Sequence, residues 1–129
     1  MRSRDQIIQD TEPFPDSVIK RLPPRNESYV PWYQYAQRLL LHHGAHRYEI
    51  SHVVYGGDKW TVAVRLYLDP DEWYDGVGTD QSADAAESQA YKRACAHAGI
   101  GLHLYEGERT GKFWLHERLK KTANDSGPE

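Results

Sequence analysis

Apolar residues recur at helical spacing in one early stretch of the chain. Between Pro31 and His43 they fall three and four residues apart, which predicts an amphipathic helix with one buried face. Pro31 suits the first turn of this helix, and Gly44 suits the position just beyond its end. The apolar face would consist of Trp32, Tyr35, Ala36, Leu39, Leu40 and His43.

The pattern then changes to alternation with a period of two. Strands are predicted at 47–55, 59–68 and 72–77, joined by turns at 56–58 and 69–71. We expect Gly76 and Gly78 to end the third strand. In the middle strand one face carries Trp60, Val62, Val64, Leu66 and Leu68, and the other carries Lys59, Thr61, Ala63, Arg65 and Tyr67.

A second helix is predicted at 83–98, between a cap at Asp80 or Ser82 and the glycines at 99 and 101. On a helical wheel its small residues fall in one arc, which would allow close packing on the sheet. The opposite side carries Gln89, Lys92 and Arg93. The small arc consists of Ala83, Ala86, Ala90, Ala94 and Ala98, widened by Tyr91 and Cys95.

These elements predict an α+β fold with an N-terminal helix, a three-stranded antiparallel sheet and a long helix, that is, a β-β-β-α core. We place the domain at 29–122. Residues 1–28 contain four prolines and no sustained periodicity, so we expect a mostly irregular arm with one short helix near 16–21. Residues 113–121 favour a short helix, and 123–129 have the composition of a disordered tail.

Composition restricts the functional classes. The chain has 129 residues, enough for one domain, and no stretch is long and apolar enough to cross a bilayer. The net charge is −3, and 29–122 hold 11 Lys and Arg against 12 Asp and Glu, so a nucleic-acid site would have to be a local patch. The single Cys95 and the absence of a signal-peptide pattern at the start favour a cytoplasmic, nucleoid-associated location.

Two groups of residues could hold nucleic acid. Lys92 and Arg93 beside Gln89, on a rigid helix, could bind a phosphate backbone without reading its sequence. Lys59, Arg65 and Tyr67 could hold a single strand by charge and stacking on an exposed sheet face. Neither group is specific by itself: the first could be a solvated helix face and the second a charged edge strand.

The stretch 88–105, SQAYKRACAHAGIGLHLY, resembles the motif of the Rad52 family of single-strand annealing proteins, including its bacterial DdrA-type members. Further stretches agree in order and spacing. They are Tyr29-Val30 before the first helix, Tyr48 in the first strand, 59–64 in the central strand and 75–78 before the long helix. The matching residues of the motif are Ser88, Ala90, Lys92, Arg93, Ala94, Gly99, Gly101, Leu104 and Tyr105.

The resemblance implies a homo-oligomer, either a closed ring or an open arc or helix, that binds single-stranded DNA in a groove and pairs it with its complement. Lys92 and Arg93 would lie in that groove, and Lys59 would belong to a second, outer site. Family members usually carry a cation early in the first helix, whereas 31–34 here has none. The groove would therefore depend more on aromatic residues such as Trp32 and Tyr33.

Beyond DNA and further copies of itself, a single-strand binding protein is a candidate partner, and no membrane, cofactor or metal is expected. The protein is expected not to be an enzyme, because base pairing supplies the free energy of annealing. A metal enzyme is the alternative suggested by His42, His43 and His46, but no carboxylate or cysteine completes a ligand spacing.

Two classes of binding protein also fit the order of helices and strands. A double-stranded RNA-binding domain shares this order, although its second helix normally opens with lysines and residues 82–87 here are acidic. A purely structural interaction domain would share the fold without binding DNA.

Overall fold

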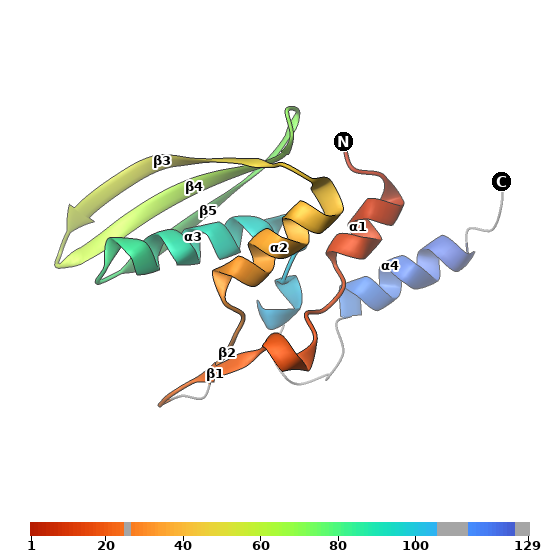
Figure 1. Ribbon diagram of the computed structural model, residues 1–129, viewed down its shortest axis with the longest axis horizontal. Coiled ribbons are helices and arrows are strands. Elements are labelled where there is room, and N and C mark those ends of the chain that lie inside the picture. Colours follow the sequence, from red (N-terminus) through yellow and green to blue (C-terminus); the bar gives the residue numbers. More distant parts are fainter. Residues whose placement is uncertain (25–26, 106–113, 126–129) are drawn as a thin grey trace.

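A computed structural model describes residues 1–24, 27–105 and 114–125. Its main sheet is antiparallel and consists of β3 (Arg47–Gly56), β4 (Lys59–Asp69) and β5 (Glu72–Asp80), in that order. The predicted helices are α2 (Trp32–His43) and α3 (Ala83–His97), and α3 lies across one face of the sheet (Figure 1). The predicted α+β fold and its β-β-β-α core are confirmed.

The third strand continues beyond its predicted end. β5 runs through both glycines to Asp80, so the expectation that Gly76 and Gly78 end it was wrong. A Cβ atom at Gly76 would lie 2.1 Å from the Ala90 carbonyl oxygen, and one at Gly78 would lie 2.2 Å from that of Ala86. Glycine in this strand therefore marks the close approach of another backbone. We call this contact between the two glycines of β5 and the alanines of α3 the glycine seam.

The N-terminal segment is more ordered than its sequence pattern predicts. It forms α1 (Arg4–Asp10), a 3-10 turn at Asp16–Val18, and a hairpin of β1 (Lys20–Leu22) and β2 (Glu27–Tyr29). The expectation of a mostly irregular arm was therefore wrong, whereas the 3-10 turn at Asp16–Val18 lies within the short helix expected near 16–21. Its apolar residues are too sparse to form a periodic pattern, yet Phe14 is buried in the main core against Tyr35.

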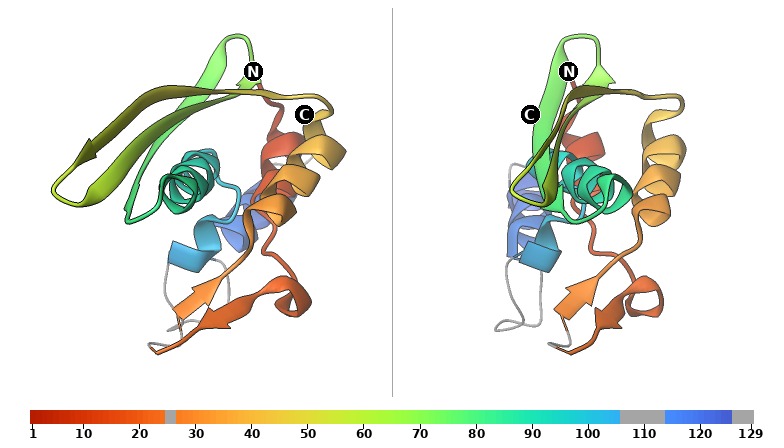
Figure 2. Two further views of the ribbon diagram at one scale, coloured as in Figure 1. Left: turned by 60° about the vertical axis from the view of Figure 1, so that its left-hand side comes forward. Right: turned by 90° about the vertical axis from the view of Figure 1, so that its left-hand side faces the viewer.

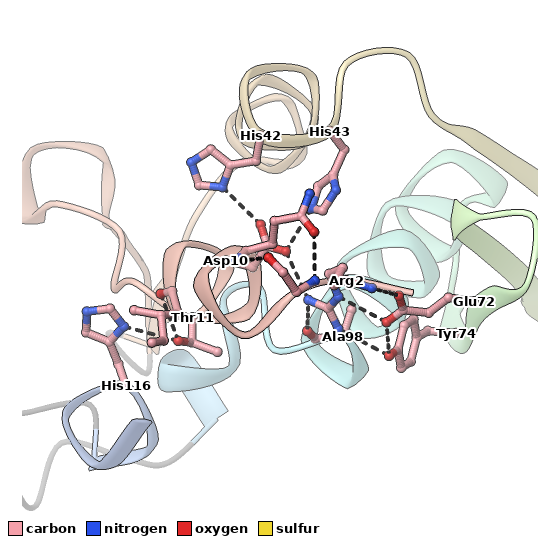
Figure 3. Close-up of polar contacts among 12 residues, drawn as sticks. Arg2, Asp10, Thr11, His42, His43, Glu72, Tyr74, Ala98 and His116 are labelled. Carbon is pink, nitrogen blue, oxygen red and sulfur yellow. Dashed lines mark hydrogen bonds and ion pairs between the residues drawn. The ribbon is translucent and has the colours of Figure 1, made fainter. Parts of the chain in front are cut away.

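A buried polar network fastens this segment to the rest of the fold (Figure 3). The Arg2 guanidinium donates from Nη1 to Asp10 Oδ2 (3.0 Å) and to the carbonyl of Ala98 (2.8 Å), and from Nε to Glu72 Oε2 (3.0 Å). Asp10 is completely buried and also contacts His42 Nδ1 (2.9 Å) and His43 Nε2 (2.7 Å). The network thus joins α1, α2, β5 and the end of α3.

The hydrophobic core lies between α2, α3 and the sheet. It is built around Tyr35, Leu39, Leu66 and Ile100, none of which is more than 1% exposed. The chain beyond α3 contributes Ile100 and the 3-10 turn Leu102–Tyr105. The last element, α4 (Trp114–Asp125), begins later and ends later than its predicted range of 113–121. It covers 123–125 of the expected tail, and 126–129 lie outside the described residues.

The described helices leave part of the sheet uncovered. α3 contacts β4 and β5, and no helix of the described ranges lies on the opposite face of the sheet (Figure 2). Four side chains of β3 share the face on which α3 lies, because their register partners in β4 lie on that face. They are Tyr48, Ile50, Val53 and Tyr55, which stand opposite Leu66, Val64, Val62 and Trp60. We call these four side chains the β3 row, and each of them is about half exposed.

Candidate nucleic-acid interface

Lys92 lies where α3 meets the residues that precede α2. Its Nζ is 3.5 Å from the Val30 carbonyl oxygen and 5.6 Å from the centre of the Tyr29 ring. The side chain is half-buried, and burial lowers its pKa below the usual value for lysine. The wheel correctly places Lys92 away from the alanine arc, but it does not show that a second segment partly covers the side chain.

Arg93 and Gln89 lie along the free edge of β5. Arg93 Nη1 donates to the Val77 carbonyl at 2.7 Å, and Gln89 Oε1 accepts from the Thr79 N–H at 3.3 Å. One turn further on, His97 contacts the Asp75 carbonyl. Arg93 is exposed, whereas Gln89 is half-buried and also donates from its amide to Asp80 Oδ2. Three side chains of α3, each four residues from the next, thus cover outward-facing backbone groups of an edge strand. We call these side chains, Gln89, Arg93 and His97, the edge row.

Aromatic rings accompany both cations. Tyr29 stands beside Lys92, and Tyr105 stands beside Arg93. Burial raises the pKa of Tyr105, and the neighbouring Arg93 guanidinium opposes that rise. The sequence shows both tyrosines only as matches to the family motif. Their position beside the cations depends on contacts between distant segments, so no local pattern could reveal it.

The predicted row on β4 lies on the other side of the sheet and is separated from α3. Arg65 directs both arms of its guanidinium to Asp75, at 2.8 and 3.1 Å. Tyr67 contacts Glu49 at 3.4 Å and lies under the Arg47 guanidinium. The charge of Arg65 is therefore balanced by a neighbouring carboxylate.

Lys59 is exposed at the β3–β4 turn, away from that paired cluster. Tyr33 lies in the first turn of α2, where its exposed ring meets Trp32 edge-on at 6.2 Å between centroids. The structure therefore groups Gln89 with Arg93 and brings Lys92 to Tyr29. Of the remaining candidates, Arg65 and Tyr67 share one face of the sheet, whereas Lys59 lies at the β3–β4 turn and Tyr33 in the first turn of α2.

The histidines and the cysteine have structural environments. His42 and His43 contact the buried Asp10, and no cluster of three metal-ligating side chains occurs in the part of the chain that is described. Cys95 is completely buried, and burial raises the pKa of its thiol. A buried neutral thiol packs as a small apolar group, as the sequence predicts. None of the helices in the described ranges is long and apolar enough to cross a membrane.

Two proteins of Arabidopsis thaliana are similar to this chain. DNA repair RAD52-like protein 1, mitochondrial, is 34% identical over 106 residues, which cover 70% of this chain and 60% of that protein. DNA repair RAD52-like protein 2, chloroplastic, is 29% identical over 118 residues, which cover 78% of this chain and 59% of that protein. No family model matches the chain.

The chain therefore spans about three fifths of the length of these curated relatives. Both are DNA repair proteins by name, so the comparison does not favour a double-stranded RNA-binding domain. It offers no support for the narrower DdrA-type group. The similarity to two RAD52-like proteins supports the Rad52 family for this chain, in agreement with the motif at 88–105.

Proposed function

We propose that this chain binds single-stranded DNA along α3 and, as a homo-oligomer, anneals it to its complement in DNA recombination and double-strand break repair. The observation that carries the proposal is the position of Lys92, whose Nζ lies 5.6 Å from the centre of the Tyr29 ring, with Arg93 one residue further along the same helix and beside Tyr105. Cations hold phosphates and aromatic faces stack on bases of any sequence. The two similar plant proteins are also named for DNA repair.

The state of the two cations favours α3 over the sheet face as the primary site. Among the described residues, Lys92 and Arg93 form no ion pair with a carboxylate, and the backbone partner of each is one carbonyl oxygen, that of Val30 for Lys92 and that of Val77 for Arg93. Phosphate oxygens could replace those carbonyls at small cost. Arg65, by contrast, would have to leave the bidentate contact with Asp75, which is the stronger kind of ion pair.

Self-association of the chain is supported by the β3 row. Its four side chains are 46–58% exposed because α3 lies mainly under β4 and β5 and covers little of β3. A contiguous exposed apolar strip on a sheet commonly marks an interaction surface. We propose that a second copy covers this strip, and that repetition of the contact produces a ring, an arc or a helix.

Annealing requires no catalytic residue, metal or nucleotide, since base pairing supplies the free energy. A single-strand binding protein is a candidate partner. A cytoplasmic, nucleoid-associated location stays a prediction, and the relatives are named as mitochondrial and chloroplastic.

The deciding experiment compares two double variants with equal loss of charge. Lys92→Ala/Arg93→Ala removes the α3 cations, and Lys120→Ala/Lys121→Ala removes two exposed lysines of α4. Fluorescence anisotropy with single-stranded oligonucleotides at several salt concentrations gives the affinity and its salt slope. The α3 variant should bind all sequences more weakly, with a salt slope lower by about one unit for each lost phosphate contact.

Annealing and assembly complete the test. The α3 variant should lose fluorescence-monitored annealing while it keeps its native mass in light scattering and its melting temperature. The α4 variant should anneal at the wild-type rate. An α3 variant that retains its mass and anneals at the wild-type rate would show that the α3 cations are not the DNA site.

A further inference from the structure

A pocket lies between the N-terminal half of α3, the start of α2 and the β3 row. Its volume is about 400 Å3, within the range of sites that take small organic groups. The wall contains three aromatic side chains and two carboxylates. These are Trp32, Tyr48 and Tyr91, with Asp84 and Glu87, and His46 closes one side.

The pocket is electrostatically negative. No cation pairs with Asp84 or Glu87 among the described residues, and Glu87 accepts from the Tyr48 hydroxyl at 3.5 Å. Burial lowers the pKa of His46, which disfavours a positive charge on its ring beside the carboxylates. The buried His46 Nδ1 has no hydrogen-bond partner within the described part of the chain. One nitrogen of the wall, His46 Nδ1, is therefore left unsatisfied, whereas His46 Nε2 lies 3.5 Å from the Tyr91 hydroxyl.

These walls select one class of ligand. Two carboxylates repel phosphate, so the pocket does not suit the DNA backbone. An apolar group would remove the carboxylates from water without compensation. A flat guanidinium or an ammonium group satisfies both parts of the wall, because it pairs with carboxylates and lies favourably on aromatic faces.

We propose that this pocket receives an arginine or lysine side chain from a second copy of the chain. Tyr48 belongs both to the pocket wall and to the β3 row, so a neighbour that covers the row also reaches the pocket. The contact is heterologous, with a pocket on one copy and a cation on the next, and contacts of this kind repeat into rings or filaments. This inference rests on the self-association in the proposed function.

The test uses Asp84→Asn/Glu87→Gln in the full chain, with Asp5→Asn/Glu117→Gln as the control. Both variants remove two negative charges, and the control changes carboxylates in the first turns of helices, where Asp84 also lies. Light scattering over a concentration series measures assembly. The pocket variant should require at least about tenfold more protein to assemble, as expected for loss of one side of a buried charge contact. The control should assemble like wild type.

A competition arm identifies the ligand chemistry. N-acetyl-arginine amide should dissociate wild-type assemblies, whereas N-acetyl-citrulline amide, which has nearly the same shape without the charge, should not. A pocket variant with wild-type assembly, or equal effects of the two amides, would overturn the pocket assignment while the proposed assembly stands. A wild-type protein that is monomeric at all concentrations would overturn both.

Discussion

Gly76→Ala tests how closely α3 approaches the sheet. The added Cβ would lie 2.1 Å from the Ala90 carbonyl oxygen and 2.4 Å from the Ala94 nitrogen, both backbone atoms that cannot rotate away. Ordinary contact begins at 3.4 Å, so α3 would have to move by the difference between 3.4 and 2.1 Å, 1.3 Å. Such a shift opens the packing around Ala86, Ala90 and Ala94, which are completely buried.

Overpacking with displacement of a backbone typically costs about 1–3 kcal/mol, and this contact falls at the upper end, at about 3 kcal/mol. For a domain of this size that corresponds to a fall in melting temperature of roughly 10 °C. Urea and thermal unfolding followed by circular dichroism would measure it. Gly56→Ala is the matched control, because nothing lies within 4 Å of its Cβ and its backbone is not in the left-handed region. Equal stability of the two variants would refute the close approach.

Two further predictions concern buried charge. Asp10→Ala should lower the free energy of unfolding by about 3 kcal/mol, because it leaves the buried Arg2 guanidinium only partly paired. Asp5→Ala in the same helix is the control and should lower it by less than about 1 kcal/mol. Urea unfolding of the two variants measures the difference. The lowered pKa of Lys92 means that its charge is present below that pKa and is lost as pH rises through it. Anisotropy at fixed salt should therefore show DNA affinity falling at a lower alkaline pH than an exposed lysine would give, and a Lys92→Met variant that keeps the same pH profile would contradict the assignment.

Local patterns predicted the central elements because each one carries its own signal. Alternation in β4 and the alanine arc of α3 depend on neighbouring residues alone, and both are where the sequence places them. The predicted end of β5 was wrong for a clear reason. Gly76 is equally suited to ending a strand and to admitting a backbone, and only the position of α3 distinguishes the two.

The candidate site was less predictable because its surroundings come from distant segments. The wheel placed Lys92 and Arg93 outside the alanine arc, but it could not show that Val30 and Val77 provide their backbone partners. The alternation in β4 likewise placed Arg65 on an exposed sheet face, but it could not show that Asp75 on the adjacent strand pairs with it. The identity of a cation's partner depends on strand register, which hydrophobic periodicity does not specify.

The edge row limits how copies of this molecule can add to one another. With the Thr79 N–H and the carbonyls of Val77 and Asp75 occupied by side chains of α3, strand addition is blocked there, whereas no described strand pairs with the outer edge of β3. Two β3 edges that pair would form a closed dimer and leave no edge for a third copy. Growth beyond a dimer by sheet extension is thus excluded while the row is in place, so a larger assembly must be built from contacts between faces.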